Sequence, residues 1–207
     1  MNNLIEIKNI VKKYGDNRKN IILNKINFSF KSGKIYSLVG PSGSGKSTLL
    51  NLLSLIDKPS SGNIKICNRN IKFSEGEKND KLRAEKIGII YQDNNLLTDF
   101  NALENVYLAR LSLNNNKEKA IKDSKLIIKK LGLSNRLNHF PSELSGGELQ
   151  RISIARALIN SPEIILADEP TGSLDFENAK SVFKSLFKLK KTNRLIVFAT
   201  HNRYFAN

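Results

Sequence analysis

The stretch "GPSGSGKST", residues 40 to 48, decides the fold class of this chain. It follows the short apolar segment "IYSLV" at 35–39 and leads into "TLLNLLSLI" at 48–56, whose apolar spacing predicts a helix. Glycines in such a loop let successive backbone N–H groups curve around an anion, and the helix start adds its positive end. A strand, this loop and a helix are the setting in which the pattern G-x-x-x-x-G-K-[ST] binds a nucleoside triphosphate.

Two side chains of the loop fit the chemistry of a bound triphosphate. Lys46 supplies a flexible positive charge for the β- and γ-phosphates, and the Ser47 hydroxyl is a ligand for Mg²⁺. An ordinary glycine turn before a helix would require neither residue. We therefore expect the whole loop to line the nucleotide: Gly40, Pro41, Ser42, Gly43, Ser44, Gly45, Lys46, Ser47 and Thr48.

A second apolar strand, "EIILADEP" at 163–170, ends in two acidic residues. Carboxylates where a buried strand emerges are costly unless they bind or react. Asp168 is placed to hold Mg²⁺ through water, and Glu169 to act as the general base that polarises the attacking water. The alternative is a pair of acidic residues that only ends the strand. Beside a phosphate loop, the catalytic interpretation is favoured.

Composition narrows the class of protein. The chain has 207 residues, enough for one α/β domain with a smaller lobe but too few for two full-size domains. Its net charge of +15 is spread through every segment and forms no basic-aromatic block, so we expect no nucleic-acid partner. No stretch reaches the length of a membrane helix, and the start lacks a signal-peptide pattern. The single cysteine fits a reducing cytoplasm.

Hydrophobic periodicity predicts the order of elements. Two antiparallel strands at 4–10 and 25–30, separated by a turn at 14–20, precede the buried parallel strand at 35–39. Strands at 61–67 and 87–92 flank a polar helix at 77–86, and only helices follow over 94–161. The chain ends with strand 163–168, helix 176–190 and strand 194–200. We therefore predict a single domain over 1–207, with an α/β core from 1–93 and 162–207 that includes the antiparallel part, and a helical subdomain at 94–161.

A second glycine-rich helix start, "LSGGE" at 144–148, completes a recognisable series. The order Tyr14, "GPSGSGKST", Gln92, "LSGGE", "ILADEP", "SLD" and His201 resembles the ATP-binding subunits of ABC transporters over nearly the whole chain. The resemblance implies a P-loop ATPase that binds ATP and Mg²⁺ and pairs head to tail with a second copy. It also implies that the signature residues act on the partner subunit's ATP: Ser145, Gly146, Gly147 and Glu148. Many family members have glutamine where this chain has Glu148.

The resemblance assigns roles to the other positions in the series. Tyr14 resembles the aromatic that stacks on adenine, although alone it could be a packed strand end. Gln92 is similar to the glutamine that reaches Mg²⁺ and links the core to the helical lobe; alone it could be a surface amide. Asp175 resembles a residue of the dimer seam. His201 resembles the histidine that contacts the γ-phosphate, and with Glu169 and Lys46 it makes up the expected catalytic set.

Within the family, "YQDNNLLTDFNALENV" and "ILADEPTGSLD" are most similar to the LolD subfamily. That resemblance implies the motor subunit of an exporter that releases lipoproteins from the bacterial inner membrane toward the outer membrane. It also implies a peripheral position on the cytoplasmic face of that membrane, and integral permease subunits of two different kinds as partners.

Three alternatives stay open: the ATPase of a macrolide or peptide efflux pump, that of the cell-division complex, and a soluble ABC ATPase that takes no part in transport. The last usually has tandem cassettes or a long coiled-coil insertion, which this sequence lacks. Two departures from the family pattern are Asn202, where aspartate is common, and a sequence that stops at Asn207, where relatives are expected to continue with a strand and a helix.

Overall fold

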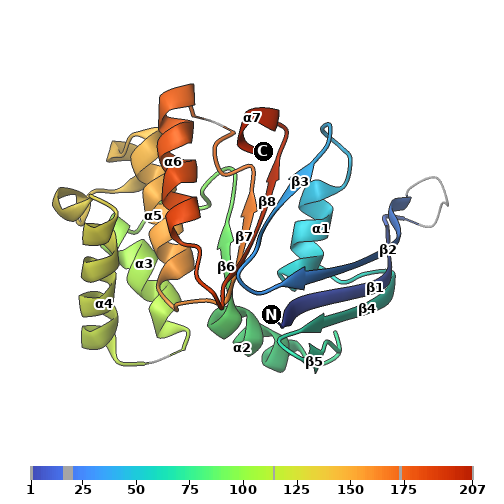
Figure 1. The fold of residues 1–207 in the computed structure, drawn as a ribbon. Coiled ribbons are helices and arrows are strands. Elements are labelled where there is room, and N and C mark those ends of the chain that lie inside the picture. Colours follow the sequence, from blue (N-terminus) through green and yellow to red (C-terminus); the bar gives the residue numbers. More distant parts are fainter. Residues whose placement is uncertain (1, 16–20, 114, 173, 207) are drawn as a thin grey trace.

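The structure, a computed structural model, describes residues 2–15, 21–113, 115–172 and 174–206 (Figure 1). Its first sheet is antiparallel, in the order β2-β1-β4-β5. The strands are β1 (Asn3–Lys13), β2 (Ile21–Lys31), β4 (Ser61–Ile66) and β5 (Arg69–Asn70). The antiparallel pairing of the first two strands is confirmed, with Ile5 opposite Phe30 and Ile7 opposite Phe28. Residues 16–20 of the predicted turn lie outside the described residues.

The second sheet is parallel, in the order β3-β8-β7-β6. Its strands are β3 (Ile35–Val39), β6 (Ile87–Ile90), β7 (Ile164–Asp168) and β8 (Leu195–Thr200). The predicted parallel core is thus confirmed, but the prediction that β3 is buried was wrong. Residues 35–38 are only partly buried, and Val39 is 50% exposed, because β3 forms the edge of this sheet and pairs only with β8 among the described residues.

Helices cover the parallel sheet on both faces (Figure 1). They are α1 (Lys46–Leu53), α2 (Gly76–Lys86), α3 (Ala102–Leu111), α4 (Lys117–Lys130), α5 (Gly146–Leu158), α6 (Phe176–Lys188) and the short α7 (Arg203–Ala206). Two 3₁₀ turns, η2 (Ser134–Arg136) and η3 (Pro141–Glu143), join α4 to α5. Within the described residues, no helix combines the length and the apolar character needed to cross a lipid bilayer.

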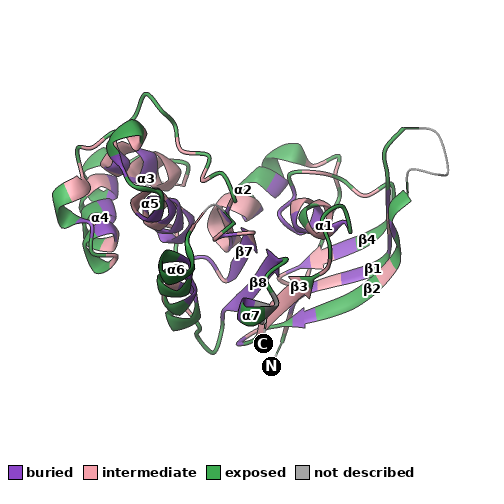
Figure 2. Cartoon of the chain, turned by 90° about the horizontal axis from the view of Figure 1, so that it is seen from above, coloured by how far each residue is buried: buried purple, intermediate pink, exposed green. Residues whose placement is uncertain are grey.

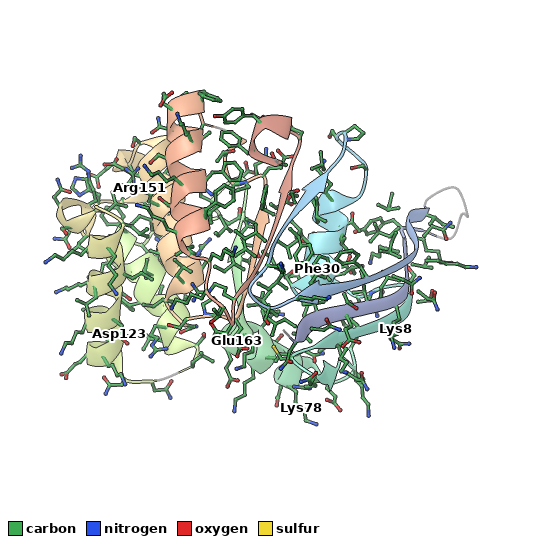
Figure 3. All side chains as sticks on the ribbon, in the orientation of Figure 1. Lys8, Phe30, Lys78, Asp123, Arg151 and Glu163 are labelled. Atoms are coloured by element: carbon green, nitrogen blue, oxygen red, sulfur yellow. The ribbon has the colours of Figure 1, made fainter. Side chains whose placement is uncertain are left out.

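Alternation along the parallel strands supplies two hydrophobic cores. Ile164 and Leu166 of β7 pack with α1 and the antiparallel sheet, while Ile165 and Ala167 face α5 and α6. This is the two-residue period of a strand that is covered on both faces. Phe30 lies between the antiparallel sheet and α1, and its ring meets Tyr36 edge-on at 5.2 Å (Figure 3). The two sheets are thereby joined through α1, directly behind the phosphate loop.

A third core holds α3, α4 and α5 together. Val106, Ile128 and Ile152, one from each helix, are fully buried at its centre. Seen from above, these helices form a group with buried inner faces to one side of the sheet (Figure 2). Gly132, with φ of 77°, follows α4 in the left-handed conformation that commonly ends a helix. The division into a core and a helical subdomain at 93/94 and 161/162 stays a prediction.

Candidate nucleotide site

The phosphate loop leaves the end of β3 and turns into α1 at Lys46. Gly43 and Gly45 have φ of 77° and 90°, values that residues other than glycine rarely adopt. At Gly45 the space is also tight, because a Cβ would lie 3.0 Å from the side chain of Leu23. The ammonium of Lys46 donates to the carbonyl oxygens of Gly40 and Pro41 at 2.8 and 3.0 Å, so the loop curls around its own lysine.

A pocket of about 300 Å³ opens over this loop. It is lined by Tyr14, Ile22, Ser42, Gly43, Gly45, Lys46, Ser47, Thr48, Gln92 and Glu169. Residues far apart in the sequence are therefore brought to one place. Tyr14 stands at the rim, 48% exposed, with its hydroxyl 3.3 Å from a carboxylate oxygen of Asp57. The ammonium of Lys12 lies over its ring, 4.8 Å from the ring centre.

Asp168 ends β7 beneath the pocket with a half-buried carboxyl group. Burial raises its pKa, against the opposing effects of a hydrogen bond with Ser47 and the charge of Lys46. Its Oδ1 atom is buried and has no hydrogen-bond partner among the described residues. A buried carboxylate oxygen without a partner, beside a serine hydroxyl, fits a hard divalent cation such as Mg²⁺.

Glu169 follows in a strained backbone conformation, with φ of 44°. Its N–H donates to the carbonyl oxygen of Ala199 on β8 at 3.1 Å, which fixes this conformation. The carboxylate lies 3.9 Å from the Lys46 ammonium and contacts Nδ1 of His201. Together with Ser42 and Gln92, these acidic and imidazole groups line an adjoining hollow of about 430 Å³. The structure thus places a carboxylate and a histidine at the mouth of the phosphate loop.

The signature segment, residues 145–148, lies apart from this pocket. Ser145 caps the start of α5, and its side chain accepts from the N–H of Glu148. Asp175 caps the start of α6 in the same way, its side chain accepting from the N–H of Asn178. The side-chain oxygen of Asn178 lies close to Gly147, 3.2 Å from the position that a Cβ there would occupy. Signature segment and Asp175 therefore neighbour each other, but neither lines the pocket over the phosphate loop. Ser173 of the "SLD" motif lies outside the described residues.

Three residues of this region had no role predicted from the sequence. Arg156 of α5 donates to the backbone carbonyl oxygens of Asn94 and Asn95, in the loop that follows Gln92. Arg136 of η2 donates to Glu148 at 2.7 Å. Gly88 of β6 lies against the backbone of α5 at Ala157. Each of these contacts forms only when the fold brings separate segments of the chain together, so no local sequence pattern could have indicated it.

A phosphate loop beside an acidic strand end defines a nucleoside triphosphatase of the P-loop class. The model of the ABC transporter family matches residues 23–172, and this chain belongs to that family. It is 43% identical, over its whole length and 92% of the relative, to the lipoprotein-releasing system ATP-binding protein LolD of Rickettsia bellii (strain RML369-C). The predicted family and fold class are confirmed.

Two further matches are to a second transport ATPase and to a solved structure. The macrolide export ATP-binding/permease protein MacB of Pasteurella multocida (strain Pm70) is 41% identical over 99% of this chain, but the match covers only 32% of MacB. Among solved structures, the ATP-binding cassette MJ0796, described as a dimer in a post-hydrolysis state bound to ADP and Pi, has a TM-score of 0.88 and 37% identity. That likeness covers 98% of this chain and 90% of the cassette.

Proposed function

We propose that this protein is the ATP-hydrolysing motor of an exporter that releases lipoproteins from the bacterial inner membrane. The observation that carries the motor activity is the meeting of Lys46, Glu169 and His201 at the mouth of the phosphate loop. The lipoprotein cargo is supported by similarity over the full length to LolD. The match to MacB leaves most of that protein unmatched, so the efflux alternative has less support.

The residues of the pocket divide the work of hydrolysis. The loop N–H groups and Lys46 bind the β- and γ-phosphates, and the Tyr14 ring stacks on adenine. Ser47, Asp168 and Gln92 would hold Mg²⁺, which neutralises phosphate charge when it is bound. Glu169 accepts a proton from the water that attacks the γ-phosphorus as the bond to the β-phosphate oxygen breaks. His201 holds the Glu169 carboxylate in place and contacts the γ-phosphate.

The separation of the signature segment from the pocket supports a head-to-tail dimer. Ser145 and the glycines after it start a helix, and the N–H groups of a helix start suit an anion. Among the described residues, the pocket over the phosphate loop is not lined by this segment. In a head-to-tail pair, each signature segment closes over the ATP of the partner subunit, and Asp175 lines the seam. The dimeric state described for the cassette MJ0796 agrees with this arrangement.

A second hollow, of about 880 Å³, supports docking of a membrane partner. It lies between α2, β6, α3 and α5, and its lining includes Arg83, Tyr91, Asn95 and Arg156. A cytoplasmic helix of a permease seated there would press on the loop after Gln92. Because Arg156 binds that loop to α5, the displacement would reach the signature segment at the other end of the helix. We place the protein on the cytoplasmic face of the inner membrane, with two different permease subunits.

Two experiments test this proposal. Replacing Glu169 with Gln should lower kcat for ATP by at least about 100-fold while nucleotide binding persists, because only the proton acceptor is removed; a wild-type rate would contradict the assigned base. Purification from native membranes in mild detergent, followed by mass spectrometry, should recover two different membrane subunits. A single membrane partner would favour an efflux or division complex, and only soluble partners would contradict the transporter function.

A further inference from the structure

The signature segment carries a negative charge that is held by an arginine from another segment. One carboxylate oxygen of Glu148 accepts from the N–H and the hydroxyl of Ser145 at 2.9 and 3.0 Å. The other accepts from Nε of Arg136 at 2.7 Å. These bonds, with that from Arg136 contributing most, lower the pKa of Glu148 to about 2, so the side chain is ionised at neutral pH.

This charge conflicts with the role proposed for the segment. The hydroxyl of Ser145 and the free N–H groups of Gly146 and Gly147 are the donors that a γ-phosphate of the partner subunit would meet. A carboxylate within one helical turn repels that phosphate and also competes for the Ser145 hydroxyl. A glutamine at this position would carry no such charge. The chain therefore needs a compensating positive charge close by.

Arg136 is placed to supply it. Its side chain is 37% exposed and comes from η2, at the opposite end of the α4–α5 connection from the signature segment. Nη1 lies 3.5 Å from Nε2 of His139, and no acidic group other than Glu148 pairs with this arginine among the described residues. The ion pair holds one oxygen of the Glu148 carboxylate on η2, while the other oxygen stays on Ser145 at the helix start.

We propose that Arg136 is a positioning residue for the partner subunit's ATP: it offsets the charge of Glu148 and restrains its carboxylate, so that the signature segment can receive a γ-phosphate. This role rests on the proposed head-to-tail dimer. Without Arg136, Glu148 would hold the Ser145 hydroxyl more firmly and repel the incoming phosphate. The arginine acts on closure of the dimer and leaves nucleotide binding to the phosphate loop of its own chain unaffected.

The test uses the Glu169→Gln background, in which ATP is bound but not hydrolysed. Dimerisation is followed by sedimentation velocity at increasing ATP, and nucleotide affinity by titration with a fluorescent ATP analogue at a protein concentration where the chain is monomeric. Adding Arg136→Gln should raise the ATP concentration for half-maximal dimerisation by about 10-fold, the effect of losing one charge-assisted contact. Affinity of the monomer for the analogue should stay within about 2-fold.

Restoration by a second substitution separates this role from a structural one. Arg136→Gln together with Glu148→Gln should dimerise within about 3-fold of the parent, since the charge that needs Arg136 is gone. Arg69→Gln is the matched control, because Arg69 also pairs with a carboxylate, that of Glu75, but on the antiparallel sheet. It should dimerise like the parent.

Three outcomes would overturn the role of Arg136 while leaving the head-to-tail dimer in place. The first is Arg136→Gln dimerising like the parent, and the second is a double variant that stays as impaired as the single one. The third is a loss of dimerisation that follows a fall in Tm, which would make Arg136 a structural tie between η2 and α5. If the parent itself binds the analogue but never dimerises, the head-to-tail arrangement fails, and the role of Arg136 fails with it.

Discussion

Replacing Gly88 with alanine should destabilise the protein strongly. Gly88 is buried in β6, where a Cβ would lie 2.3 Å from the carbonyl oxygen of Ala157 and 3.0 Å from the ring of Pro162. The nearest atom belongs to the backbone of α5, so no rotation of a side chain can relieve the contact, and the helix must move away from the strand. Overpacking of this kind costs about 3 kcal/mol, the upper end of the usual range.

For a chain of this size, that loss corresponds to a fall in Tm of ~6–12 °C. Differential scanning fluorimetry of the nucleotide-free protein measures it. Gly76→Ala is the matched control, because Gly76 is exposed at the start of α2 and no atom lies within 4 Å of its Cβ position. Its Tm should change by no more than about 2 °C. If Gly88→Ala behaved like the control, the close approach of β6 and α5 would be refuted.

Three further predictions concern the pocket and the signature segment. Asp168→Asn should raise the Tm by ~2–4 °C, since it removes a half-buried charge whose burial raises the pKa of Asp168. The same substitution should abolish Mg²⁺-dependent hydrolysis. Scanning fluorimetry measures the first effect and phosphate release the second, and a lower Tm would contradict the reasoning. Tyr14→Ala should weaken ATP binding, measured by titration calorimetry, about 10-fold because the stacking ring is lost. Tyr14→Phe loses only the contact with Asp57, so its affinity should stay within about 2-fold of the parent. Equal losses in the two variants would contradict stacking. The pKa of Glu148 is lowered from 4.5 to about 2, so its stabilising contribution is complete above pH 4.5 and is lost as the pH falls toward about 2. When the free energy of unfolding is measured over this pH range, Glu148→Gln should make it depend less steeply on pH. An unchanged slope would contradict the ion pair of Glu148.

Local patterns predicted most of the fold, because strands, helices and the phosphate loop each depend on neighbouring residues. The period of two in β1 and the glycines of residues 40–45 are of this kind. Exposure of β3 could not be predicted, since an apolar strand has the same pattern at an edge as in the middle of a sheet. Burial depends on pairing between segments far apart in the chain.

The same limit applies to the site. Phosphate-loop residues are contiguous and could be predicted from their spacing alone. Tyr14 and Gln92 needed the family resemblance, and the structure then placed both at one pocket. Neither the local sequence pattern nor the family resemblance indicated a role for Arg136 or Arg156. An arginine in a polar turn and an arginine on a helix are ordinary surface residues until the fold brings a carboxylate or a carbonyl group to meet them.

Helix α5 contributes side chains to two hydrophobic cores at once. Ile154 and Leu158 belong to the core beside the parallel sheet, whereas Ile152 and Ala155 belong to the core of α3 and α4. Unfolding of either core would expose an apolar face of α5 to water, so the two cores should unfold as one cooperative unit. Amide hydrogens in the middle of α5 would then exchange only through global opening. The helix that presents the signature segment would be among the last parts of the molecule to lose its structure.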